Sequence, residues 1–211
     1  MTGSRDRRPL ASRASAAAGA LAGRIARSAI TPNQISQAGL VAALLAALCL
    51  WGGAGATGVA RVALLIGAAA LIQLRLSCNL LDGMVAIEAG KAAPDGPFWN
   101  EVPDRIADIA ILAGAGYAVG EPGLGWAAAA LAVLTAYIRE LGAGLGAPAD
   151  FRGPMAKPHR MALMTVAAIA ACFEPLWGTQ EFVLRGALWV VVAGTALTCV
   201  RRAGRLLRVL G

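Results

Sequence analysis

The sequence predicts an all-α integral membrane protein with six transmembrane helices and an amphipathic helix before them. Its 211 residues are 58% hydrophobic and 15% charged, and their mean hydropathy is +0.64, which is too apolar for an ordinary soluble domain. Six apolar runs are each close to the ~20 residues that span a bilayer core. The net charge of +7 comes from bases that flank these runs, as orientation signals do, so nucleic-acid binding is not expected.

The N-terminal segment, residues 1–30, carries six arginines among Ala, Ser and Gly and has no uninterrupted apolar core. It therefore does not read as a signal peptide. Its later part is predicted to form an amphipathic helix on the anionic cytoplasmic surface of the membrane. The remainder, residues 31–211, is predicted to be one membrane domain.

The first membrane helix is predicted to begin at Thr31-Pro32, because Thr caps helix N-termini and Pro is tolerated in the first turn. Glycine-rich breaks, 52–55, 120–123 and Gly178, separate later runs. The six predicted spans are 33–53, 59–81, 99–119, 123–143, 160–177 and 182–200.

Basic residues predict the orientation of the bundle. With both termini inside, the inner segments hold most of them, and only Arg61 and Arg185 lie near the outer side. The positive-inside rule therefore predicts that both termini lie in the cytoplasm. The protein itself is predicted to lie in the inner (plasma) membrane. Residues 82–108 then lie at the cytoplasmic side.

Six acids occur between Asn79 and Asp108, next to long apolar runs: Asp82, Glu88, Asp95, Glu101, Asp104 and Asp108. A carboxylate at the centre of a membrane helix costs roughly 2.5 to 3.5 kcal/mol, so such residues are normally paired, bound to metal or turned toward a water-filled cavity. The stretch therefore predicts a functional site.

The spacing predicts two facing rows of oxygen ligands. Asn79 and Asp82 are three residues apart, and Asn100, Asp104 and Asp108 follow one another at steps of four, so each set shares one helix face. Carboxylate and amide oxygens suit hard cations such as Mg²⁺, Mn²⁺ and Ca²⁺. One His and four scattered Cys are too few for a zinc site.

The motif that starts at Asn79 resembles the signature of the CDP-alcohol phosphatidyltransferases, D-x2-D-G-x2-A-R-x8-G-x3-D-x3-D. Every spacing is kept, and three identities differ: Asn79 and Asn100 replace aspartates, and Ile87 replaces Arg. The chain is similar to a branch of the family that has Asn at both positions and Glu after the second, as in Asn100-Glu101. The matching residues are Asp82, Gly83, Ala86, Gly96 and Asp104.

The resemblance implies transfer of a phosphatidyl group from CDP-diacylglycerol to an alcohol, with release of CMP and dependence on Mg²⁺ or Mn²⁺, by a homodimer embedded in membrane lipids. Asp104 matches the general base of the family. Asp108, one turn later, is a second candidate for the base on geometry alone. The expected metal ligands are Asn79, Asp82, Asn100, Glu101 and Asp104, and Gly83, Ala86 and Gly96 are expected beside the substrate.

A basic loop at 150–160 precedes the fifth predicted span. Arg152, Lys157 and Arg160 are candidates to hold phosphates of the nucleotide or the acceptor, and so is Arg105, beside Asp104. Positive-inside flanking explains the loop equally well. Family members usually have a Lys near the start of this helix, which favours Lys157.

Two further readings stay open. A non-catalytic membrane protein or transporter that kept the fold is the alternative to an enzyme, and metal binding at the acids distinguishes them. The identity of the alcohol acceptor is also open. Membrane prenyltransferases require packed DDxxD or NDxxD motifs, which Asn79-Leu80-Leu81-Asp82 does not match.

Overall fold

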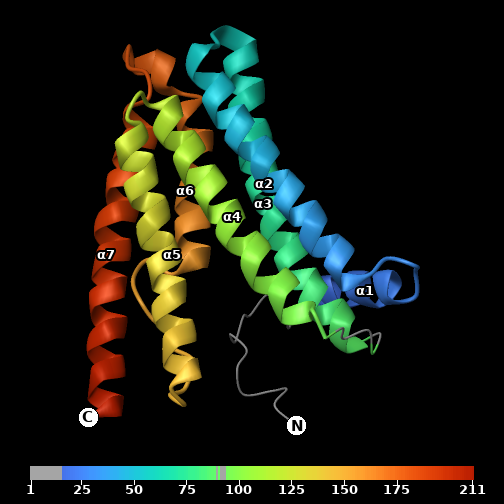
Figure 1. Cartoon of the computed structure of the whole chain (residues 1–211). Helices are drawn as coiled ribbons and strands as arrows, with labels where there is room; N and C mark the ends of the chain where they lie inside the picture. Colours follow the sequence, from blue (N-terminus) through green and yellow to red (C-terminus); the bar gives the residue numbers. More distant parts are fainter. Residues whose placement is uncertain (1–15, 89, 91–93) are drawn as a thin grey trace.

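The computed structural model describes residues 16–88, 90 and 94–211, and these residues form an all-helical bundle (Figure 1). The predicted all-α class is confirmed. The helices are α1 (Ala16–Ala26), α2 (Pro32–Gly55), α3 (Gly58–Glu88), α4 (Gly96–Ala118), α5 (Pro122–Gly144), α6 (Lys157–Ala171), the short 3-10 helix η2 (Glu174–Trp177) and α7 (Phe182–Leu210).

Each predicted apolar run falls mainly on its own helix, from α2 to α7. Four of these helices, α2, α3, α5 and α7, are long and apolar enough to cross a membrane. The predicted run to residue 177 is wrong at its end, because α6 stops at Ala171 and η2 follows. Pro175 explains the change, because proline has no N–H to donate to the Ala171 carbonyl four residues earlier and its ring clashes with that carbonyl in an α-helix.

Helix α2 begins as predicted, with a capping box at Thr31. The Thr31 hydroxyl accepts from the Gln34 backbone N–H at 3.2 Å, and the Thr31 N–H donates to the Gln34 side chain at 3.0 Å. Before it, α1 lies across the end of the bundle and packs on α3 (Figure 1), where Ala22 and Ile25 join a small apolar cluster. Residues 1–15 of the predicted N-terminal segment lie outside the described residues.

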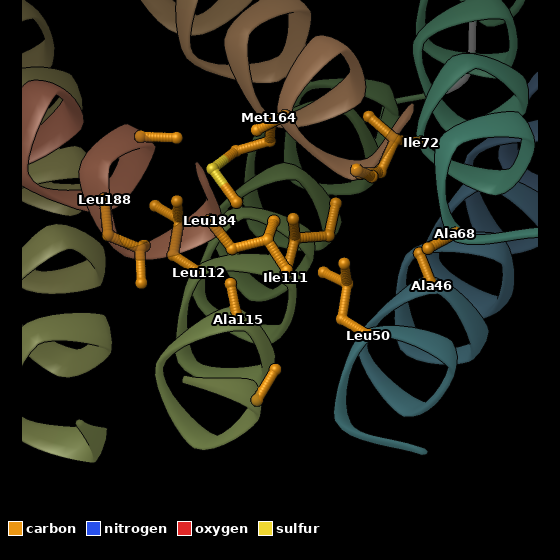
Figure 2. Close-up of a cluster of buried hydrophobic side chains, with 14 of the residues drawn as sticks. Ala46, Leu50, Ala68, Ile72, Ile111, Leu112, Ala115, Met164, Leu184 and Leu188 are labelled. Carbon is orange, nitrogen blue, oxygen red and sulfur yellow. The ribbon is translucent and has the colours of Figure 1, made fainter. Parts of the chain in front are cut away.

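The core is built from many alanines with a few large side chains. Helix α2 packs on α3 and α4, α4 on α5, α5 on α7, and α6 on α3 and α7. Leu50, Ile111, Leu112 and Met164 meet between them (Figure 2). Small residues permit this close approach, as is usual at membrane helix interfaces.

The crossing of α4 and α5 depends on two glycines. A Cβ at Gly116 would lie 2.6 Å from the Gly125 Cα, and a Cβ at Gly125 would lie 2.7 Å from the Gly116 Cα. No side chain fits at either position without moving a backbone. This contact brings α5 against α4, whose opposite end carries the site residues.

Candidate active site

A pocket lies between α2, α3 and α4, near the end of α3 and the start of α4. The structure brings Asn79, Asp82, Asn100 and Asp104 together on its wall. Asn79 and Asp82 come from the last turns of α3, and Asn100 and Asp104 come from the first turns of α4. The other lining residues are Ser36, Gly39, Leu40, Arg75, Cys78, Trp99, Pro103 and Ala107.

Asp82 is buried and is held by neutral donors. Its carboxylate accepts from the Ser36 hydroxyl at 2.6 Å and from the Gly83 backbone N–H at 2.5 Å. No salt bridge within the described part of the chain includes Asp82. Asp82 is therefore the pocket acid whose charge is left for a bound cation.

Asp104 lies among three donors. The Asn79 side-chain amide donates to its Oδ1 at 3.0 Å, and Arg75 lies 3.2 Å from the same oxygen. The Lys157 ammonium donates to the other oxygen, Oδ2, and also to the Asn79 Oδ1 at 2.9 Å. Lys157, the first residue of α6, thus reaches both the first and the last position of the motif.

Asp108 is enclosed, with 1% of its surface exposed. Its Oδ1 accepts from Arg75 at 2.8 Å and its Oδ2 accepts from Arg160 at 2.9 Å. Arg160 also donates to the Met155 carbonyl at 3.0 Å. Both oxygens of Asp108 are therefore committed to arginines that hold α3, α4 and α6 together.

The remaining predicted residues lie around the pocket rather than on its wall. Glu101 accepts from Arg105 and, at 2.6 Å, from Arg139 of α5. Arg152 has 76% of its side chain exposed and pairs with Asp150. Gly83 and Ala86 are half-buried on α3 beyond Asp82, and Gly96 begins α4 with open space beside its Cα. Glu101 thus faces two cations in this structure.

Sequence reasoning missed two polar residues of the pocket wall that bind its acids, Arg75 and Ser36. Arg75 was not a candidate, yet it contacts both Asp104 and Asp108; its position four residues before Asn79, on the same helix face, was the available signal. Charge within an apolar segment was a second signal. Ser36 gave none, because a serine near the start of a helix is common.

A second pocket lies between α5, α7 and the 145–156 loop. Arg139, Arg152, Arg202 and Arg205 line it together with Asp150. Burial raises the pKa of Asp150, but hydrogen bonds from Arg152 and Arg205 outweigh it and lower the pKa below its usual value. The loop is tied to α7 where the Met155 N–H donates to the Thr198 hydroxyl at 3.1 Å.

The α3–α4 pocket suits a hard cation better than a soft one. Its donors are carboxylate and amide oxygens, and no cation among the described residues pairs with Asp82. Because two of its four motif positions are Asn, no group of three His, Cys, Asp or Glu able to hold a metal occurs among the described residues. The set therefore fits a divalent ion, with fewer charged ligands than four aspartates offer.

Comparison with known proteins gives consistent relatives. The chain is 28% identical over 199 residues to a phosphatidylinositol phosphate synthase of Mycobacteroides abscessus, covering 86% of this chain and 80% of the relative. It is 25% identical over 185 residues to the Mycolicibacterium smegmatis protein of the same name, covering 83% and 77%.

Solved structures share the fold. The phosphatidylinositol phosphate synthase of Mycobacterium tuberculosis with CDP-DAG bound superposes with a TM-score of 0.73 at 20% identity, covering 90% of this chain and 92% of that one. The same enzyme in complex with manganese and citrate gives 0.74 at 20% identity, covering 90% and 88%.

No family model matches the chain. The named relatives, the shared fold and the motif spacing around the α3–α4 pocket nevertheless agree. The sequence relatives named above are members of the CDP-alcohol phosphatidyltransferase family, and this chain shares that family's motif spacing and the fold of its solved structures.

Proposed function

We propose that this protein transfers a phosphatidyl group from CDP-diacylglycerol to an alcohol and releases CMP, using Mg²⁺ or Mn²⁺. The observation that carries the proposal is the α3–α4 pocket, whose wall holds all four polar positions of the motif, Asn79, Asp82, Asn100 and Asp104. The names of the relatives support the reaction, and the manganese complex of a structural relative supports the metal.

Asp104 is the proposed general base. Its side chain is 12% exposed and lines the pocket, whereas the side chain of Asp108 is 1% exposed and does not line the pocket. Asp104 accepts the proton of the acceptor hydroxyl, which attacks the β-phosphate while the bond to CMP breaks. Asp108 is instead a positioning residue that fixes Arg75 and Arg160.

Asp82, Asn79, Asn100 and Asp104 are the residues proposed to hold the metal. When bound, the metal supplies positive charge to the diphosphate. Lys157 lies against Asp104 and adds a second positive group that neutralises phosphate charge. Glu101, engaged by Arg105 and Arg139, is proposed to anchor α5 beside the pocket rather than to bind metal.

We also propose that α2 to α7 make six spans with both termini in the cytoplasm of the plasma membrane, as one domain over residues 31–211 that works as a homodimer. Helix α4 carries the site charges, and α6 is only about 22 Å long, with η2 extending it. The end of α3 and the start of α4, which carry the pocket residues, lie at the same end of the bundle as the C-terminal end of α7 (Figure 1), which supports a cytoplasmic site.

The acceptor to test first is inositol phosphate, because the sequence relatives named above are phosphatidylinositol phosphate synthases. The basic side chains of the second pocket, Arg139, Arg152, Arg202 and Arg205, would favour a phosphorylated alcohol over a neutral one.

The direct test is CMP release by purified protein in liposomes that contain CDP-diacylglycerol, with Mg²⁺ or Mn²⁺. Inositol phosphate, glycerol phosphate, inositol and serine are supplied one at a time. Metal-dependent release that rises with one acceptor supports the proposal. Glu121→Gln, a neutralised acid at the opposite end of the bundle, is the control variant. Absence of both release and CDP-lipid binding would favour the non-catalytic alternative.

A further inference from the structure

The charges around the α3–α4 pocket are balanced by protein groups alone. Three buried carboxylates, Asp82, Asp104 and Asp108, are accompanied by three cations. These are Arg75, Lys157 and Arg160. The described side chains of the site therefore carry no net charge before any ligand binds.

The balance depends on the two asparagines. At Asn79 the amide uses its nitrogen to donate to Asp104 and its oxygen to accept from Lys157. An aspartate at this position has no side-chain N–H to donate to Asp104, and it would place a second negative charge beside that residue. The neutral amide thus lets one carboxylate and one ammonium share a site in which two carboxylates would require more positive charge.

The donor limits how much metal charge such a site can take. Each phosphate of the CDP-lipid diphosphate carries one negative charge, so one divalent ion neutralises the donor in a site that is already neutral. A second divalent ion would leave excess positive charge in a partly buried pocket, where unbalanced charge is costly.

The position of Lys157 points the same way. Its ammonium lies between the Asn79 and Asp104 oxygens, at the first and last positions of the motif, whereas Asp82 is left without a cation. The Asp104 side of the pocket therefore already has a positive group, the Lys157 ammonium, whereas the Asp82 side has none among the described residues.

We infer that the pocket takes one divalent cation together with the diphosphate donor, on the Asp82 side, and that the Lys157 ammonium serves as the second positive centre. The inference rests on the proposed function. It assigns Lys157 a place in the charge balance of the reaction, beyond contact with a substrate phosphate.

The experiment counts Mn²⁺ bound per chain by electron paramagnetic resonance, in nanodiscs that contain CDP-diacylglycerol and no acceptor. We expect one Mn²⁺ per wild-type chain. A triple variant with Asn79→Asp, Asn100→Asp and Lys157→Met should gain a second Mn²⁺. Methionine keeps an apolar stem at position 157 and removes the positive charge. The matched control combines the same two aspartates with Lys157→Arg, and its second site should be at least tenfold weaker.

Two Mn²⁺ per wild-type chain, or none, overturns the inference, and so does equal second-site affinity in the two triple variants. Circular dichroism and CDP-lipid binding verify that each variant is folded. CMP release is measured on the same wild-type sample after an acceptor is added. Release with two Mn²⁺ bound rejects the inference and leaves the proposed function standing, whereas absence of release with every acceptor counts against the function itself.

Discussion

Arg61 and Glu174 form a buried ion pair of 2.7 Å at the end of the bundle opposite the α3–α4 pocket, with side chains only 3% and 0% exposed. Arg61 also donates to the Gly53 carbonyl, and Glu174 accepts the backbone N–H groups of Glu181 and Val183. The pair therefore joins the end of α2 and the start of α3 to η2 and the start of α7.

Arg61→Met should lower the free energy of unfolding by about 3 to 5 kcal/mol, because it leaves the Glu174 carboxylate buried without a counter-charge. Thermal unfolding in detergent measures the effect. The control is Arg152→Met, which removes an exposed ion pair and should cost no more than about 1 kcal/mol. Equal losses in both variants would show that the Arg61 pair is not a structural clamp.

Asp82→Ala and Asp104→Asn should each reduce CMP release by about a hundredfold or more, with little change in folding, because each removes charge at the reacting phosphates. The assay is the liposome reaction described above, with circular dichroism on the same samples. Activity that survives both substitutions would remove the assigned site.

Asp108→Asn should differ from Asp104→Asn in kind. It leaves Arg75 and Arg160 buried beside a neutral amide, so the loss is expected first in stability, by about 3 to 5 kcal/mol. Comparing the unfolding temperature and the CMP release of the two variants separates the roles. A stable Asp108→Asn protein without activity would instead make Asp108 the base.

Asn79→Asp together with Asn100→Asp should tighten binding of the first metal ion, because two neutral oxygen donors become charged ones. Titration with Mn²⁺ measures the dissociation constant, and EDTA should abolish CMP release in wild-type protein. Weaker metal binding in the double variant would show that these positions do not face the metal.

Gly116→Ala should cost about 1 to 3 kcal/mol, because its Cβ would enter the backbone of α5 at Gly125. Gly186→Ala is the matched control, since a Cβ at this α7 position meets nothing within 4 Å. Unfolding in detergent compares the two. Equal stability of both variants would contradict the close approach of α4 and α5.

Local patterns explain what the sequence predicted well. Apolar runs, proline and glycine breaks and the Thr31 cap are properties of neighbouring residues, so the helices and most of their boundaries could be predicted. The motif spacing likewise located the pocket, because residues three and four apart share a helix face.

Long-range pairing explains what the sequence did not show. Arg75 contacts acids 29 and 33 positions away, Lys157 reaches Asn79 across 78 positions, and Arg61 reaches Glu174 across 113. Which cation meets which acid depends on helix packing. For the same reason, the sequence could not show whether Glu101 forms ion pairs with two arginines or binds a metal.

The loop before α6 joins Arg152, which lines the second pocket, to Lys157, which contacts Asp104 of the first pocket. Its Arg152 carbonyl accepts from Arg202 at 3.0 Å, its Met155 N–H is held by Thr198, and the helix that carries Lys157 starts two residues later. The Lys157 ammonium therefore follows directly on a short loop, and Arg152 of this loop lines the basic pocket between α5 and α7. One continuous segment of chain, Arg152 to Lys157, therefore contributes both to the wall of the basic pocket and to the amine beside Asp104.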